Sequence, residues 1–130
     1  MNTIITPQSA ALSLIIDKLK SEIESDIIIA PLPEEGGITV EISSAENKGR
    51  YLNNKHGKES LTVLFLCKNT SQSYAYNVLC AIGNLLNALK PIEGDNVTIS
   101  GAEVRNGAGL VGNDGGFYVY SMIAAVNIIF

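Results

Sequence analysis

The sequence predicts an α+β domain in which two helices pack on one face of a mainly antiparallel sheet of four to five strands. Two segments repeat apolar residues at helical spacing, and the segments between and after them alternate or are continuously apolar, as strands do. The expected order is helix, two or three strands, helix and two strands, without the strict alternation of a doubly wound parallel sheet. The chain has 130 residues, and we expect residues 1–130 to form a single domain.

The first helix is expected to begin at Thr6 and Pro7. Threonine can act as an N-cap, and proline suits the first helical position because its missing N–H would be unpaired there. The apolar residues that follow form one stripe, which predicts an amphipathic helix of about four to five turns. This stripe consists of Leu12, Ile15, Ile16, Leu19 and Ile23.

Three segments between the two helices are expected to be strands. Residues 26–30 predict a short strand that ends at Pro31, because proline cannot donate a ladder hydrogen bond. Residues 38–42 alternate strictly and predict a half-buried strand, and residues 61–67 predict a strand that is apolar on both faces. Residues 43–60 are expected to form a polar connection between them.

The second helix is expected to begin at a cap formed by Asn69, Thr70 or Ser71 and to end at Pro91. Its apolar stripe predicts which face meets the sheet. We therefore expect Leu85→Asp to unfold the domain, because it would bury an unpaired carboxylate. The stripe consists of Val78, Leu79, Ile82, Leu85, Leu86 and Leu89.

The end of the chain is strongly apolar. Residues 97–104 predict a strand interrupted by Gly101, and residues 106–116 predict a glycine-rich loop. Residues 117–130, with the sequence FYVYSMIAAVNIIF, contain no charge, and neither of their two alternating faces is polar. Either this strand is central, between the helical layer and the chain's own loops, or a neighbouring subunit covers its second face.

Composition and motifs argue against nucleic acid binding and against most enzyme classes. The chain has 13 acidic and 9 basic residues, whereas phosphate binding favours a basic surface. Residues 107–112 match the dinucleotide pattern G-x-G-x-x-G, but a turn and a strand are expected after them, where the pyrophosphate would need a helix. His56 is the only histidine and lies among lysines in a polar segment. We therefore expect no catalytic residues, no metal site and no cofactor.

Two further patterns concern thiols and membranes. Cys67 and Cys80 are expected to be reduced, buried and apolar in character. No charge-free run reaches the roughly 18 residues of a membrane span, and no segment has the pattern of a signal peptide. The sequence thus predicts neither a disulfide nor contact with a membrane.

The main local charge asymmetry is a basic cluster within residues 48–58. It permits three interpretations: a solvated loop, a docking site for an acidic protein surface, or a nucleic-acid contact with only Tyr51 for base stacking. Together with two tyrosines of the final segment, this cluster forms our candidate interface. Its members are Lys48, Arg50, Tyr51, Lys55, His56, Lys58, Tyr118 and Tyr120.

Three segments carry a family resemblance. They are PLP at residues 31–33, GRYLNNKHG at residues 49–57 and LTVLFLCKNTSQSYA at residues 61–75, which leads into the second helix. Over residues 8–125 the chain resembles the small tail terminator proteins of long-tailed bacteriophages, often labelled minor capsid proteins. The element order and the strand-to-helix junction at Lys68 and Asn69 contribute to this resemblance.

The resemblance implies a structural protein of the virion and no enzyme. Members of such families cap the end of the tail tube, usually as a six-fold ring, and present a surface to the head connector. The expected partners are therefore further copies of the chain, a tail tube protein and a head connector protein, assembled in the cytoplasm of the bacterial host. The alternatives are a generic protein-interaction module and a domain that binds a small ligand between sheet and helices.

Overall fold

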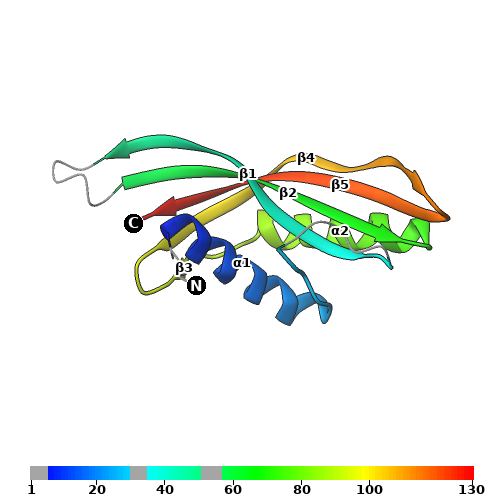
Figure 1. Cartoon of the computed structure of the whole chain (residues 1–130). Helices are drawn as coiled ribbons and strands as arrows, with labels where there is room; N and C mark the ends of the chain where they lie inside the picture. Colours follow the sequence, from blue (N-terminus) through cyan, green and yellow to red (C-terminus); the bar gives the residue numbers. More distant parts are fainter. Residues whose placement is uncertain (1–5, 30–34, 51–56) are drawn as a thin grey trace, which may run out of the picture.

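The structure, a computed structural model, describes residues 6–29, 35–50 and 57–130, with the backbone alone for residues 47–50. Along the described residues, two strands follow the first helix and three strands follow the second (Figure 1). In chain order they are α1 (Pro7–Ile23), β1 (Gly37–Arg50), β2 (Gly57–Asn69), α2 (Gln72–Asn87), β3 (Ile92–Glu93), β4 (Thr98–Asp114) and β5 (Phe117–Ile129).

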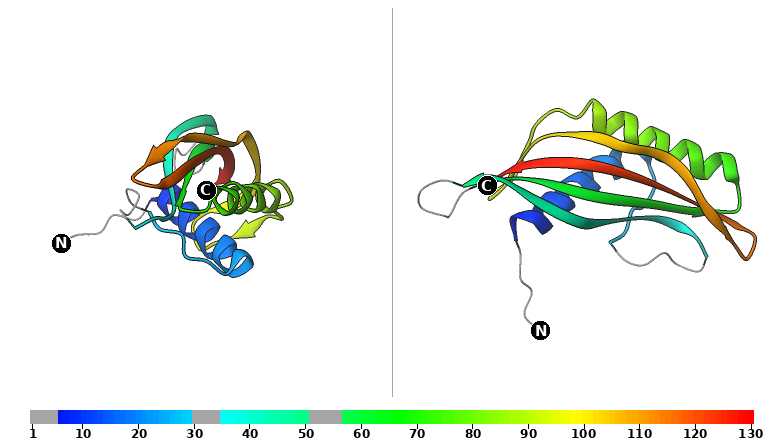
Figure 2. Two further views of the ribbon diagram at one scale, coloured as in Figure 1. Left: turned by 90° about the vertical axis from the view of Figure 1, so that its right-hand side faces the viewer. Right: turned by 90° about the horizontal axis from the view of Figure 1, so that it is seen from above.

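The five strands form one sheet in the order β1-β2-β5-β4-β3, and every pair of neighbouring strands is antiparallel. Both helices lie on the same side of this strongly twisted sheet (Figure 2). The predicted α+β architecture is therefore confirmed. β5, the final segment, is central in the strand order, because it pairs with β2 on one side and with β4 on the other.

Both helix starts follow from capping side chains. The hydroxyl of Thr6 accepts a hydrogen bond from the backbone N–H of Ser9 at 3.1 Å, and Pro7 occupies the first helical position. Of the three candidate caps for α2, the structure selects Ser71, whose hydroxyl accepts from the N–H of Tyr74 at 3.2 Å. The expectation that Pro91 ends this helix was wrong, since α2 ends at Asn87.

The two expected connections around the hairpins were wrong. Residues 43–60 contain the last part of β1 and the first part of β2, and residues 106–114 belong to β4. A polar or glycine-rich segment can be a strand when a neighbouring strand supplies the ladder hydrogen bonds and the packing. The loop between β4 and β5 is only the two-residue turn Gly115 and Gly116, whose φ angles of 57° and 89° suit glycine.

Two short elements also differ from the expectation. The strand expected over residues 26–30 is absent from residues 26–29, the part that the structure describes, where only Ile28 makes an isolated parallel bridge, with Thr39 of β1. The two-residue strand β3 was not predicted, and it pairs with the first two residues of β4. Elements this short leave no periodicity by which a sequence could indicate them.

The hydrophobic core lies between the helical layer and one face of the sheet. The α1 stripe is buried as predicted up to Leu19, and α2 is buried at Leu79, Ile82 and Leu86, while Leu85 is only half-buried. One face of β5 joins this core. Its buried members are Tyr120, Met122, Ala124, Val126 and Ile128.

The other face of the sheet carries a second set of apolar side chains. Leu64 and Ile123 are cross-strand partners on this face, and all of its members named below are half-buried. Neither helix covers them, because both helices pack against the opposite face. We call this set the open face; it consists of Leu64, Leu66, Val119, Ile123 and Ile129.

Candidate interaction surfaces

The basic cluster lies at one end of the sheet, where β1 and β2 meet. Lys48 and Arg50 are among the last three residues of β1, and Lys58 is the second residue of β2, opposite Gly49. The side chain of Lys58 is exposed. Tyr51, Lys55 and His56 lie outside the described residues. The strand pairing thus brings at least three of the basic positions to the same end of the molecule.

The acid next in sequence to Lys58 is directed elsewhere. Glu59 is buried, and its Oε1 accepts a hydrogen bond from Gln8 Nε2 of α1 at 2.6 Å. Neighbouring residues on a strand point to opposite faces, so the carboxylate of Glu59 lies on the helical side and Lys58 on the other. The last residue, Phe130, exchanges two backbone hydrogen bonds with Gly57 at this end of the sheet, with lengths of 2.8 and 2.9 Å.

The two candidate tyrosines lie at the opposite end of the sheet. Along β2 and β5, Lys58 pairs with Ile129 whereas Asn69 pairs with Tyr118. This separation of eleven residues corresponds to roughly 36 Å in an extended strand. The structure therefore does not bring the basic cluster and the tyrosines together into one surface.

Tyr120 is a core residue in this structure. Its ring is buried, its hydroxyl accepts a hydrogen bond from Gln72 Nε2 at 2.9 Å, and its ring makes an edge-to-face contact with Tyr76 at 5.9 Å. Tyr118 is half-buried and packs against the edge of the core. Of the two, only Tyr118 keeps part of its surface available for a partner.

The sequence did not predict the buried lysine that lies on the same side of the sheet as the open face. Lys68 Nζ lies 2.9 Å from Asp114 Oδ2 and 5.0 Å from the ring centre of Phe117. The side chain of Lys68 is 8% exposed and that of Asp114 is 72% exposed. The contact holds the tip of the β4–β5 hairpin against β2. The only signal in the sequence is a charged residue directly after the apolar run of residues 61–67.

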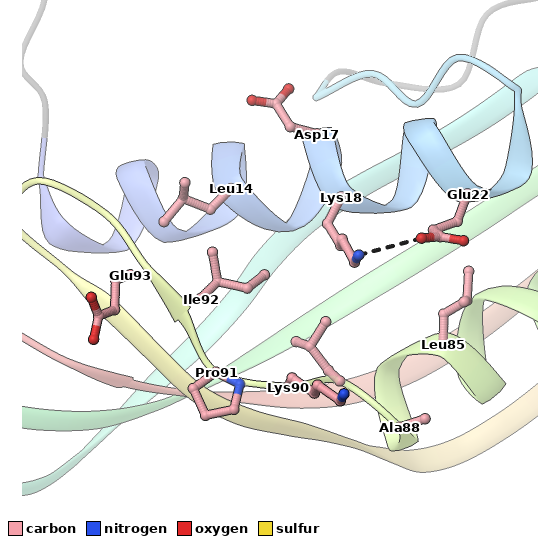
Figure 3. Close-up of a pocket in the computed structure, with 11 residues that line it drawn as sticks. Leu14, Asp17, Lys18, Glu22, Leu85, Ala88, Lys90, Pro91, Ile92 and Glu93 are labelled. Atoms are coloured by element: carbon pink, nitrogen blue, oxygen red, sulfur yellow. Dashed lines mark hydrogen bonds and ion pairs between the residues drawn. The ribbon is translucent and has the colours of Figure 1, made fainter.

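A groove of about 830 Å³ lies between α1 and α2 (Figure 3). Its walls include Leu14 of α1, Leu85 and Leu89 near the end of α2, and Ile92 of β3. The ion pair between Lys18 and Glu22, 3.3 Å long, lies along α1 at its side. These two charges satisfy each other, so they do not converge on a ligand in the way that a specific small-molecule pocket requires.

Few side chains in the part of the chain that the structure describes are arranged to bind a metal ion or to react. No three His, Cys, Asp or Glu residues within it are placed to hold a metal ion. Both cysteines are free thiols, and burial raises the pKa of Cys67 to about 11. A side-chain hydrogen bond with Cys80 is the largest of the causes that raise the pKa of Tyr76.

Among the described helices, none combines the length and the apolar character needed to cross a bilayer. The match of residues 107–112 to the dinucleotide pattern falls within β4, and β5 follows it, so no helix begins there. No protein-family model matches the chain, and no curated protein matches it either.

Proposed function

We propose that this chain is a structural subunit of a bacteriophage tail, which caps the end of the tail tube as a ring and contributes to its junction with the head connector. The observation that carries the proposal is the open face. It adds a second apolar surface to a sheet whose first face already contains the core. A strand with one wet side would alternate apolar and polar residues, which β5 does not do.

The strand composition supports assembly more than it supports a monomeric function. Leu64 of β2 lies directly opposite Ile123 of β5. Leu66 lies opposite Ser121 and is therefore diagonal to Ile123 and Val119, so apolar residues of the two strands meet there. Contiguous exposed apolar surface commonly marks a protein–protein contact. A ring subunit uses a different patch for each of its two neighbours, and it needs further surface for the rings above and below.

The same proposal includes the absence of enzymatic activity and localisation to the virion. Its supports are the resemblance in residues 49–57 and 61–75 and the sparse chemical machinery of the described residues. The basic end of the sheet, with Lys58 exposed, is a second contact surface for an acidic partner ring. A generic interaction module would share the open face but would not be encoded beside tail genes.

The experiment is deletion of the gene in the phage that encodes this chain, followed by electron microscopy of the tails. We expect tails of abnormal length without joined heads, restored by the wild-type chain and not by Ile123→Glu. The matched control is Ile29→Glu, which changes an apolar residue that is 56% exposed and lies outside the open face. Thermal unfolding of both purified variants must show that they fold. Tails of normal length with joined heads in the deletion strain would contradict the proposal.

A further inference from the structure

β4 contains the only Asn-Gly sequence of the chain, at Asn106 and Gly107. An asparagine before a glycine is chemically labile, because the backbone nitrogen of the glycine can attack the side-chain carbonyl carbon of the asparagine and close a five-membered ring. Both reacting groups belong to one molecule and are held close together. Glycine has no Cβ, so its nitrogen is easily approached and its backbone rotates freely.

The strand is irregular at this position. Between Asn106 and Gly109, β4 has two residues where β5 has only Met122, and the register also shifts between Val104 and Asn106. A bulge of this kind interrupts the ladder of hydrogen bonds and leaves an extra residue unpaired. The backbone around Gly107 is therefore less constrained than the backbone of a regular strand.

The outer edge of β4 adds to this freedom. β3 pairs only with Thr98 and Ile99, and beyond them β5 is the only strand of the described residues that pairs with β4. Asn106 and Gly107 are both exposed. Among the described residues, none makes a hydrogen bond with the side-chain amide of Asn106. The amide is therefore free to rotate toward the nitrogen of Gly107.

We propose that Asn106 is a site of spontaneous deamidation in the folded protein, with water as the only co-reactant. The nitrogen of Gly107 loses its proton and bonds to Cγ of Asn106, and the side-chain nitrogen leaves with a proton as ammonia. Water then opens the cyclic imide at one of its two C–N bonds. Opening at Cγ gives aspartate, and opening at the backbone carbonyl gives isoaspartate, in which the main chain runs through Cγ.

The product places a new charge beside the open face. Asn106 and Ile123 are cross-strand partners, and such partners lie on the same face of a sheet. Any surface that covers Ile123 has to desolvate the new carboxylate, which is costly when the charge is unpaired. Isoaspartate also lengthens the main chain by one carbon within the bulge. The reaction itself does not depend on the proposed ring function.

The only Asp-Gly sequence of the chain, at Asp114 and Gly115, provides an internal comparison. The same ring closure there has to expel water from a carboxyl group, and an ionised carboxylate reacts poorly with a nucleophile. The carboxylate of Asp114 is also held by Lys68 Nζ at 2.9 Å. We therefore expect Asp114 to react more slowly than Asn106.

The experiment is incubation of the purified full chain in mildly alkaline buffer, followed by peptide mapping with mass spectrometry and an isoaspartate assay. We expect Asn106 to convert several-fold faster than any other asparagine, with release of an equal amount of ammonia. The rate should rise with pH, because the attack requires the deprotonated nitrogen of Gly107.

Two glycine variants make the matched comparison. Gly107→Ala should suppress most of the conversion, because a side chain crowds the attacking nitrogen. This variant should fold, since the φ angle of Gly107 is not positive and an added Cβ meets no atom within 4 Å. Gly109→Ala adds the same methyl group in equally open space on the same strand, and it should leave the rate unchanged.

The outcomes also distinguish a reaction of the folded protein from a reaction that follows unfolding. Circular dichroism before and after incubation checks that the chain stays folded, and a parallel sample is incubated in urea. Conversion in urea alone, or in neither sample, would overturn the inference. An unchanged rate in Gly107→Ala, or faster conversion at another asparagine, would overturn it as well.

Discussion

The ammonium group of Lys68 reaches across β5 to Asp114 Oδ2 at 2.9 Å and so joins β2 to the end of β4, two strands away. Phe117, the first residue of β5, lies under the same ammonium group at 5.0 Å. The cation is almost fully buried, but its carboxylate partner is largely exposed. This asymmetry decides how the two partners should respond to substitution.

Replacement of Asp114 by Asn should cost little, because an ion pair with one solvated partner contributes about 1 kcal/mol or less. Lys68→Met should be neutral or stabilising, since it replaces a buried charge with an apolar side chain of similar length. Urea unfolding of both variants measures the two free energies. The matched control is Arg105→Gln, which breaks an ion pair that is exposed on both sides. A loss of about 3 kcal/mol for Asp114→Asn would show that the pair is effectively buried.

The two neighbouring leucines of α2 should respond differently to a buried charge. Leu86 is fully buried, so Leu86→Asp should prevent folding. Leu85 lines the groove between the helices and is half-buried, so Leu85→Asp should lower the melting temperature while the domain still folds. The sequence-based expectation that Leu85→Asp unfolds the domain is revised accordingly. Circular dichroism melting curves of the two variants make the comparison, and equal loss of structure would contradict it.

The turn between β4 and β5 predicts a contrast between two glycines. An added Cβ meets no other atom within 4 Å at either Gly116 or Gly112, but only Gly116 has a positive φ, of 89°. Gly116→Ala should therefore lower the free energy of unfolding by about 1–2 kcal/mol, the cost of a left-handed backbone for an L-residue. Gly112→Ala should be close to neutral or slightly stabilising, because it only restricts the unfolded chain. Chemical denaturation is the measurement, and equal effects would refute the role of the turn.

Burial of the Cys67 thiol predicts a loss of stability in alkaline solution. Its pKa rises from 9.0 to about 11 on folding because burial disfavours the thiolate. Below pH 9 the thiol is neutral in both states. Between pH 9 and 11 it ionises only in the unfolded chain, so the folded state loses up to about 3 kcal/mol. Above pH 11 the thiol ionises in both states, so the stability that its burial contributed is fully lost and does not decline further. The free energy of unfolding, measured from pH 8 to 11, should decline less steeply for Cys67→Ala than for wild type.

The basic end of the sheet predicts a salt-sensitive assembly step. Lys55→Glu combined with Lys58→Glu should leave the melting temperature nearly unchanged. Lys58 is exposed, and a substitution at an exposed position usually changes stability by about 0.5 kcal/mol or less. The same variant should form fewer tails with joined heads, and salt should weaken wild-type association, if this end docks on an acidic ring. The control is Lys90→Glu, at an exposed residue that follows the end of α2 in the chain. Normal virions from the double variant would contradict a docking role for the basic cluster.

The starts of the helices could be predicted from the residues at each start. The extent of the strands could not, because it depends on pairing with other strands. Thr6, Pro7 and Ser71 mark helix starts by hydrogen-bonding capacity that belongs to the residues themselves. Residues 106–114 were expected to be a loop because glycine and asparagine disfavour strands in isolation. Their strand depends on a ladder with β5, which only the folded chain supplies.

The candidate interface could be predicted only in part, for a related reason. Lys48, Arg50 and Lys58 are near one another in the sequence, and a hairpin keeps them near in space. Tyr120 was included in the candidate interface, but it lies on the face of β5 that meets α2. The contact between Lys68 and Asp114 joins residues 46 positions apart, and no local pattern indicates a pair at that separation.

The strand order has a consequence for how the chain reaches its native state. β1 with β2 and β4 with β5 are hairpins of neighbouring segments, whereas the seam between β2 and β5 joins Lys58 to Ile129 across most of the chain. Local hairpins close in microseconds, but pairing at long sequence separation is slow because the entropy of loop closure must be lost first. Folding should therefore proceed as two halves that form early and a seam that forms last. Substitutions at the seam, such as at Leu64 or Ile123, should slow refolding more than equally destabilising substitutions within either hairpin.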